Sequence, residues 1–118
     1  MIRVQTEHGE ISVSSAVFTA ITGAAATNCF GVKGMAYRSM TDGIVHLLRR
    51  ESMSKGVRVE FHEDNTISID LHIMVGNGVN FNAVSESIIE EVRYMVQKCT
   101  GTDVRAVNVF IDSITIGK

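Results

Sequence analysis

In the segment Cys29–Arg38, CFGVKGMAYR, one glycine precedes and one follows a lysine. A Gly-x-x-Gly turn of this kind can bind a ligand. The backbone amides of such a turn can cradle a phosphate, with Lys33 supplying a positive charge. The same turn can also serve only to lead the chain from one helix into the next. Both alternatives are open from the residues. A bare four-residue motif is weak evidence for a phosphate site, so the turn between helices is the favoured interpretation.

The residues that follow this turn are basic, although the whole chain has a formal net charge of −2. Residues 31–58 contain two acidic residues, Asp42 and Glu51, against six basic ones, which gives a local charge of +4. The basic residues are Lys33, Arg38, Arg49, Arg50, Lys55 and Arg58. A local basic region can bind an anionic partner even in an acidic protein. A solvated loop and helix end is the simpler interpretation.

The remaining polar residues do not form a recognisable catalytic, metal or cofactor site. His62, His72, Glu60 and Asp70 alternate along two predicted strands, and alternate residues on a flat sheet lie ~6–7 Å apart, too far for a shared metal. Ser14 and Ser15 are placed to cap a helix, and His46 lies among leucines, which is typical of a packed histidine.

The two cysteines are too few for a disulfide framework and lack the Cys-x-x-Cys spacing of a redox or metal site. We expect Cys29 and Cys99 to be free thiols, packed like small apolar residues. An enzyme that uses Cys29 as its nucleophile is a weaker alternative. We therefore expect no enzyme activity and no cofactor.

Alternating patterns predict the strands that position these residues. Residues 2–13 predict two short strands around a His8–Gly9 turn. Residues 57–61 and 67–73 predict an antiparallel hairpin with one apolar and one polar face, in which Arg58 lies across from Asp70.

Helical spacing predicts three helices. The first, near residues 14–28, has an apolar face of Val17, Phe18, Ile21, Ala24 and Ala25, and its small residues favour close packing against another element. A second, short helix is expected over residues 41–50. The third, over residues 81–100, begins at Asn80 or Asn82 and ends at Gly101, and its core face is Phe81, Val84, Ile88, Val92, Met95, Val96 and Cys99.

These elements predict a single α+β domain over residues 1–118, with a small mixed or antiparallel sheet and helices packed on one face. Their order, β-α-α-β-β-α-β, is similar to that of the type I KH domain, whose Gly-x-x-Gly loop clamps single-stranded nucleic acid. The corresponding nucleic-acid residues here would be Gly31, Lys33, Gly34, Arg38, Arg49 and Arg50. In KH domains the second helix follows the glycines directly, whereas residues 35–40 intervene in this chain.

The final strand, over residues 104–116, breaks its own alternation. Val107, Val109 and Ile111 point inward, whereas Phe110, Ile114 and Ile116 have the opposite parity, so a bulge is expected near Asp112–Ser113. Apolar residues on the outer face of an edge strand are typical of self-association or docking. A strand that switches faces to cover the core is the equal alternative.

No apolar run approaches the ~20 residues that span a bilayer, and the first ten residues lack an apolar signal region. We therefore expect a cytoplasmic protein that meets a membrane through a partner or through a surface patch.

The chain as a whole resembles the alkaline shock protein family of Gram-positive cell-envelope stress proteins. The resemblance covers nearly the whole length, and its more specific stretches are Phe30–Gly31–Val32 with Met35, SKGVRVE, GVNFNAV and TGTDVRAVNV. The family commonly carries prolines where Phe30 and Asn82 stand here.

This resemblance implies a non-enzymatic scaffold or interaction protein linked to envelope homeostasis and stress response. It implies action through self-association, as a homo-oligomer, and through protein partners, among them a membrane-anchored relative. Binding of nucleic acid through the Gly31–Gly34 loop is the alternative function.

Overall fold

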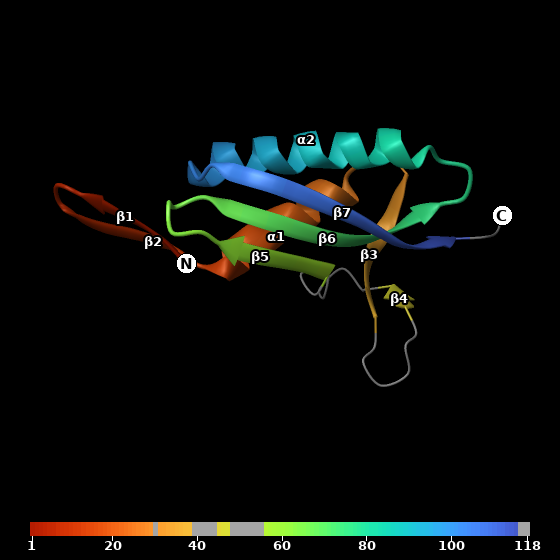
Figure 1. Ribbon diagram of the computed structural model, residues 1–118, viewed down its shortest axis with the longest axis horizontal. Coiled ribbons are helices and arrows are strands. Elements are labelled where there is room, and N and C mark those ends of the chain that lie inside the picture. Colours follow the sequence, from red (N-terminus) through yellow and green to blue (C-terminus); the bar gives the residue numbers. More distant parts are fainter. Residues whose placement is uncertain (30, 39–44, 48–55, 116–118) are drawn as a thin grey trace.

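The computed structural model describes residues 1–29, 31–38, 45–47 and 56–115, with the backbone alone described in 35–38 and 45–47. Two helices and seven strands follow one another along the chain (Figure 1). Their order and bounds are β1 (Ile2–Thr6), β2 (Gly9–Val13), α1 (Ser15–Thr27), β3 (Val32–Arg38), β4 (Val45–Leu47), β5 (Val57–Phe61), β6 (Ile67–Gly76), α2 (Phe81–Thr100) and β7 (Val104–Thr115). The predicted α+β class is confirmed.

The main sheet is built around β6, which pairs with three strands: β3, β5 and β7. β5 pairs antiparallel with Ile67–Leu71, and β3 pairs antiparallel with Ile73–Val75, so these two strands share one edge of β6. β7 runs parallel to β6 along the other edge. A parallel pair requires a crossover connection, and α2 provides it. The sheet is therefore mixed, as predicted.

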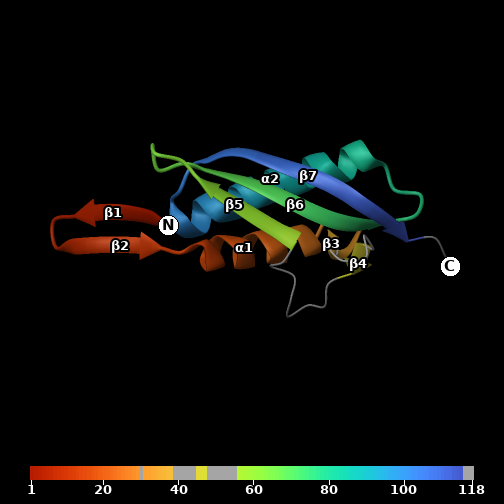
Figure 2. The same ribbon diagram turned by 60° about the horizontal axis from the view of Figure 1, so that its bottom comes forward.

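Both helices cover the same face of this sheet (Figures 1 and 2). Five side chains of β6 on that face are fully buried: Ile67, Ile69, Leu71, Ile73 and Val75. Val84, Ile88, Val92 and Val96 of α2 pack on them. Phe18 of α1 completes the core and meets Phe61 of β5 edge-on, with ring centroids 5.8 Å apart.

The predicted ends of α2 are confirmed in detail. The Asn80 side chain accepts a hydrogen bond from the Ala83 amide at 2.9 Å, which satisfies a free donor of the first turn. Gly101 takes a left-handed conformation, φ +73°, and donates to the Gln97 carbonyl. The predicted core face was too wide, because Phe81 and Cys99 are exposed and Met95 is only half-buried.

The α1 helix is confirmed, but its buried face is rotated from the predicted one. Phe18 and Ala25 are buried as expected, whereas Val17 and Ala24 are exposed and Thr22 and Ala26 are buried instead. The small residues do allow close packing, because α1 lies against α2. Ser14 occupies the N-cap position but its side chain makes no capping hydrogen bond.

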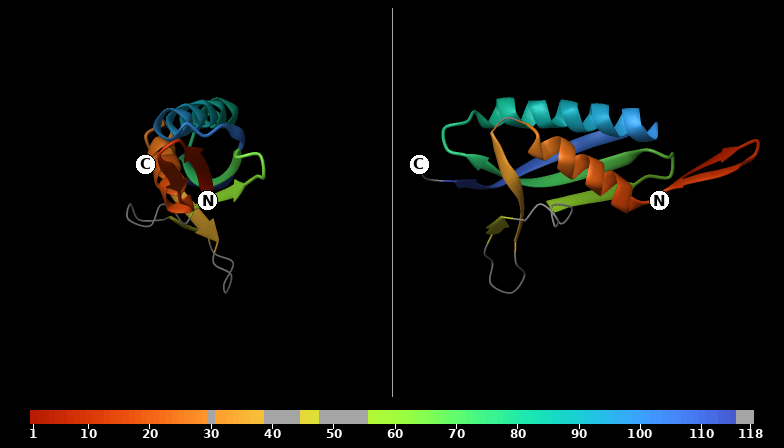
Figure 3. Two further views of the ribbon diagram at one scale, coloured as in Figure 1. Left: turned by 90° about the vertical axis from the view of Figure 1, so that its left-hand side faces the viewer. Right: turned by 180° about the vertical axis from the view of Figure 1, so that it is seen from behind.

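Both predicted hairpins are confirmed, as is the pairing of Arg58 with Asp70; the turn of the first hairpin lies at residues 7–8, one residue before the predicted His8–Gly9 turn, because Gly9 pairs with Thr6. The first hairpin, β1–β2, extends beyond the sheet at one end of the molecule's long axis (Figure 1 and Figure 3, right). The radius of gyration is 15.2 Å, against about 13.5 Å for a compact chain of this length.

The predicted second helix is wrong where the structure describes it. Val45–Leu47 forms a strand, β4, that pairs antiparallel with Ala36–Arg38 of β3. The rest of the predicted helix lies outside the described residues. A short apolar run such as Ile44–Leu48 fits a strand and a helix equally well, and pairing with a neighbouring strand decided between them. The KH-like order of elements is therefore corrected, because strands occupy the place of its second helix.

Candidate protein-interaction surfaces

β7 forms one free edge of the sheet, and β5, which also pairs only with β6 among the described elements, lies at the other. Within the described part of the chain, β7 pairs only with β6, so the backbone groups on its other side are open. Phe110 stands on the face of this strand that the helices leave uncovered, because its neighbour across the ladder is His72 rather than a core residue. The Phe110 side chain is 44% exposed. The predicted outward position of Phe110 is confirmed.

Phe110 belongs to a small cluster with two polar residues. Its ring stacks on the His72 imidazole, with centroids 4.9 Å apart and planes 15° from parallel. The Nδ1 atom of His72 lies 2.8 Å from the Asp112 carboxylate. The carboxylate and the phenyl ring together fix the orientation of the imidazole and leave Phe110 as an apolar point on a polar face.

A bulge separates Phe110 from the other two residues of the predicted apolar set. The register with β6 shifts between Ile111 and Ser113, which leaves Asp112 as the extra residue, as the parity change predicted. After the shift Ile114 is the neighbour of Val75, a core residue, so Ile114 lies on the helix side of the sheet. Ile114 stays 37% exposed there, and Ile116 lies outside the described residues. The face-switching alternative therefore describes Ile114, and self-association stays a prediction for Phe110.

The other polar side chains of the open face satisfy one another in separate pairs. Asn108 donates to the Asp70 carboxylate at 2.9 Å, and His62 lies 2.7 Å from the Ser68 hydroxyl. Across the residues whose side chains are described, no group of three histidine, cysteine or carboxylate side chains could hold a metal ion.

The segment Gly31–Gly34 does not connect two helices. Val32 and Gly34 both lie in β3, and the register with β6 shifts between them, so that Lys33 is a bulged, exposed residue at the start of a strand. Gly31 has φ +90° and packs against α2 and the segment before it: a Cβ there would lie 3.0 Å from Val84 Cγ2. The predicted turn between helices is therefore wrong, and so is the KH-type loop. The Arg38 side chain, Arg49 and Arg50 lie outside what the structure describes.

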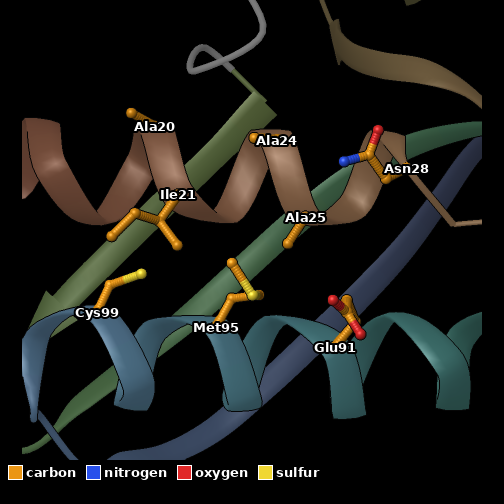
Figure 4. A pocket seen from close by; sticks show the side chains of 8 residues that line it. All are labelled: Ala20, Ile21, Ala24, Ala25, Asn28, Glu91, Met95 and Cys99. Atoms are coloured by element: carbon orange, nitrogen blue, oxygen red, sulfur yellow. The ribbon is translucent and has the colours of Figure 1, made fainter.

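A groove between α1 and α2 was not predicted. It encloses about 340 Å³ and is lined by Ala20, Ile21, Ala24, Ala25, Asn28, Glu91, Met95 and Cys99 (Figure 4). The alanines of α1 leave this space because they are too small to fill it. The signal in the sequence was the run of small residues, which predicted close packing but not the gap beside it.

The two thiols differ in their surroundings. Burial raises the pKa of the Cys29 thiol and is the largest effect. A hydrogen bond with Ser87 lowers the pKa to a smaller extent, and the Glu91 carboxylate raises it to a still smaller extent. The free thiol of Cys99 is exposed at the groove. A raised pKa keeps Cys29 protonated at neutral pH, the opposite of what a nucleophilic cysteine requires.

The β1–β2 hairpin carries a second surface that sequence reasoning missed. Val4 and Ile11 face each other across the hairpin and are 46% and 55% exposed. The signal was available, because Ile2, Val4, Ile11 and Val13 alternate with polar residues, but alternation alone does not say that a face lacks a cover.

These features define a class of protein: a two-layer α+β domain with a β-α-β crossover, one open sheet face and exposed apolar residues on an edge strand and a hairpin. No helix among the described residues is long and apolar enough to cross a membrane. The chain belongs to the alkaline shock protein family, described as having a cell envelope-related function, whose model matches residues 3–116. The resemblance seen in the sequence is thereby confirmed.

Relatives of similar length support this assignment. YloU of Bacillus subtilis (strain 168) is 33% identical over 116 residues, which cover 98% of this chain and 96% of YloU. Spy1614 of Streptococcus pyogenes serotype M6 is 34% identical over 116 residues, 98% of this chain and 95% of that protein.

Solved structures share the fold alone. A structure of the MamM CTD superposes with a TM-score of 0.52 at 16% sequence identity, covering 85% of this chain and 99% of the MamM chain. A manganese form of the MamM CTD gives a TM-score of 0.51 at 17% identity, covering 85% of this chain and 99% of that chain.

Proposed function

We propose that this chain is a non-enzymatic scaffold that acts in envelope homeostasis and stress response through self-association and protein partners. It works from the cytoplasm, and a membrane-anchored relative is one partner that would bring it to the membrane. The family's cell envelope-related function supports the setting. The observation that carries the proposal is the open edge of β7 with Phe110 exposed beside it.

An open strand edge is a surface for main-chain pairing. β7 is 12 residues long, and its backbone groups on one side have no partner strand among the described elements. A second copy of the chain, or an extended segment of another protein, can add a strand there. The register shifts at Arg105 and Asp112 limit the regular stretch to residues 106–111, and Phe110 supplies an apolar contact near its end.

The polar residues favour this role over catalysis. The histidines and carboxylates of the open face form the separate pairs described above, and the His72 ring is covered by Phe110. Catalysis would need a nucleophile, a base and an orienting group to converge on a single point. These side chains instead hold the surface of β7 in one shape.

The test compares Phe110→Asp with Tyr94→Asp, a change at another exposed aromatic, which lies on α2 and is 58% exposed. Both variants add the same charge. We expect Phe110→Asp to lower the assembled mass in size-exclusion chromatography and to reduce capture of envelope partners after crosslinking in cells, while Tyr94→Asp leaves both unchanged. Equal assembly and equal capture by the two variants would reject β7 as the interface. Recovery of RNA in place of protein would favour the nucleic-acid alternative.

A further inference from the structure

The N-terminal arm, residues 2–13, has an apolar face that begins in the core and ends in solvent. Residues paired across a hairpin share a face, so Ile2, Val13, Val4 and Ile11 form one stripe. Ile2 is 3% exposed and Val13 is half-buried, whereas Val4 and Ile11 are open. Along β1, the apolar face therefore changes from buried at Ile2 to exposed at Val4.

Among the described residues, this arm makes few contacts with the rest of its chain. The hydrogen bond described between its backbone and the body joins the Asn65 amide to the Arg3 carbonyl at 3.4 Å. An isolated two-stranded hairpin is only marginally stable in water. A cover for Val4 and Ile11 would stabilise the arm by removing their apolar surface from water.

The groove between α1 and α2 offers such a cover. Its α1 wall is uncharged, because α1 contains no acidic or basic residue from Ser15 to Thr27, and the α1 residues that line it are Ala20, Ile21, Ala24 and Ala25. The groove follows α1 from Ala20 to Asn28, about 12 Å at 1.5 Å per residue. The arm is of similar length, because four steps along β1 span about 13 Å.

The charges match in one orientation. Arg3 lies at the base of the arm and Glu7 at its tip, and both side chains are exposed. Along α2, Glu91 lines one end of the groove, and Lys98 adjoins Cys99 at the other, about 10 Å away. An arm whose tip points toward Cys99 brings Glu7 near Lys98, whereas the reverse orientation would bring Glu7 near Glu91; Arg3 lies on the face opposite Val4 and points away from the groove.

The arm does not reach this groove in its own chain. It leaves from the N-terminal end of α1 and points away from both helices, whereas the groove lies along the second half of α1 (Figure 3, right, and Figure 4). We propose that the N-terminal arm of one copy lies in the α1–α2 groove of a second copy. Because the two surfaces differ, the contact is heterologous, and it either repeats head to tail or is exchanged within a dimer. This inference rests on the proposed self-association and names a second interface for it.

A disulfide test reports the contact directly. In Thr6→Cys, which replaces an exposed residue on the same face near the tip of the arm, mild oxidation should join the new thiol to Cys99 of another copy and give a covalent dimer or ladder on a non-reducing gel. Cys99→Ser in the same chain should abolish the product. Val17→Cys, which replaces an exposed residue of α1 outside the groove, should crosslink at least tenfold less. A disulfide that forms within one chain, or equal crosslinking by Val17→Cys, would overturn the proposal.

A complementation test separates this interface from the β7 edge. In the Phe110→Asp background, Val4→Asp damages only the arm and Ala24→Glu only the groove, both at exposed positions. Each variant alone should be a single chain, whereas an equimolar mixture should form a heterodimer, since one intact arm and one intact groove remain. A mixture that stays monomeric while the Phe110→Asp parent assembles rejects the arm contact alone. A native protein that is monomeric at every concentration rejects the proposed function as well.

Discussion

Gly31→Ala gives a quantitative test of why a glycine occupies this position. Gly31 has φ +90°, a conformation that side chains disfavour, and an added Cβ would lie 3.0 Å from Val84 Cγ2 and 3.2 Å from Val79 Cγ1. Gly78 is a matched control, because its φ is +89° and its Cβ would meet no described atom within 4 Å. The two substitutions therefore share the backbone cost and differ in the steric one.

The expected magnitudes follow from these contacts. An alanine at such a φ costs about 1 kcal/mol of folding free energy at either site. Overpacking against Val84, which is 6% exposed, adds about 1–2 kcal/mol at Gly31 alone. For 118 residues, each kcal/mol lowers the melting temperature by about 4 °C, so Gly31→Ala should melt about 4–8 °C below Gly78→Ala.

The assay is urea and thermal unfolding followed by circular dichroism, with both variants measured beside the native chain. A Gly31→Ala variant as stable as Gly78→Ala would refute the packing argument. Equal stability would favour the other explanation of this glycine, which is close approach of a ligand to the backbone.

Four further outcomes are expected. Thr22→Val should raise the free energy of unfolding by about 1 kcal/mol, because the buried Thr22 hydroxyl has no hydrogen-bond partner in the described structure, and a loss of stability in urea would contradict this. The Thr66 hydroxyl, at 2.6 Å, is the main cause that holds the pKa of Asp64 below its ordinary 3.8. The native chain should therefore have a higher melting temperature than Asp64→Asn at pH 7, and this difference should disappear as the pH falls below about 4. A difference that is unchanged at pH 2 would show the assignment to be wrong. An alkylating probe should label Cys99 before Cys29, as mass spectrometry can read, and faster labelling of Cys29 would reopen the thiol-enzyme alternative. Fluorescence anisotropy with short single-stranded oligonucleotides at low salt should stay flat, whereas salt-sensitive binding weakened by Lys33→Glu would support the nucleic-acid alternative.

Elements with a strong local pattern were predictable from the sequence. The β5–β6 hairpin alternates over a long stretch, and α2 combines an apolar stripe with Asn80 before it and Gly101 after it, so local and tertiary preferences agree. The segment around Val45 has only four apolar residues, and although Thr41 and Asp42 before them favour a helix start, the strand there depends on pairing with β3, which no local pattern contains.

For the candidate surfaces, the sequence could predict only which face of a strand each side chain occupies. Phe110 was placed correctly because it precedes the bulge, whereas Ile114 follows it and takes the other face. The N-terminal arm and the groove could not be found this way. Their exposure depends on which elements fail to cover them, and that is a property of the assembled chain.

We propose that this chain works by associating with itself and with other proteins through β7. Sedimentation velocity of the native chain and of Phe110→Asp over a wide range of concentration tests it most directly. We expect a native mass that rises with concentration above that of one chain, and a lower mass for Phe110→Asp at each concentration. A native chain that sediments as a single copy throughout, or a Phe110→Asp variant that assembles identically, would show that β7 does not mediate self-association.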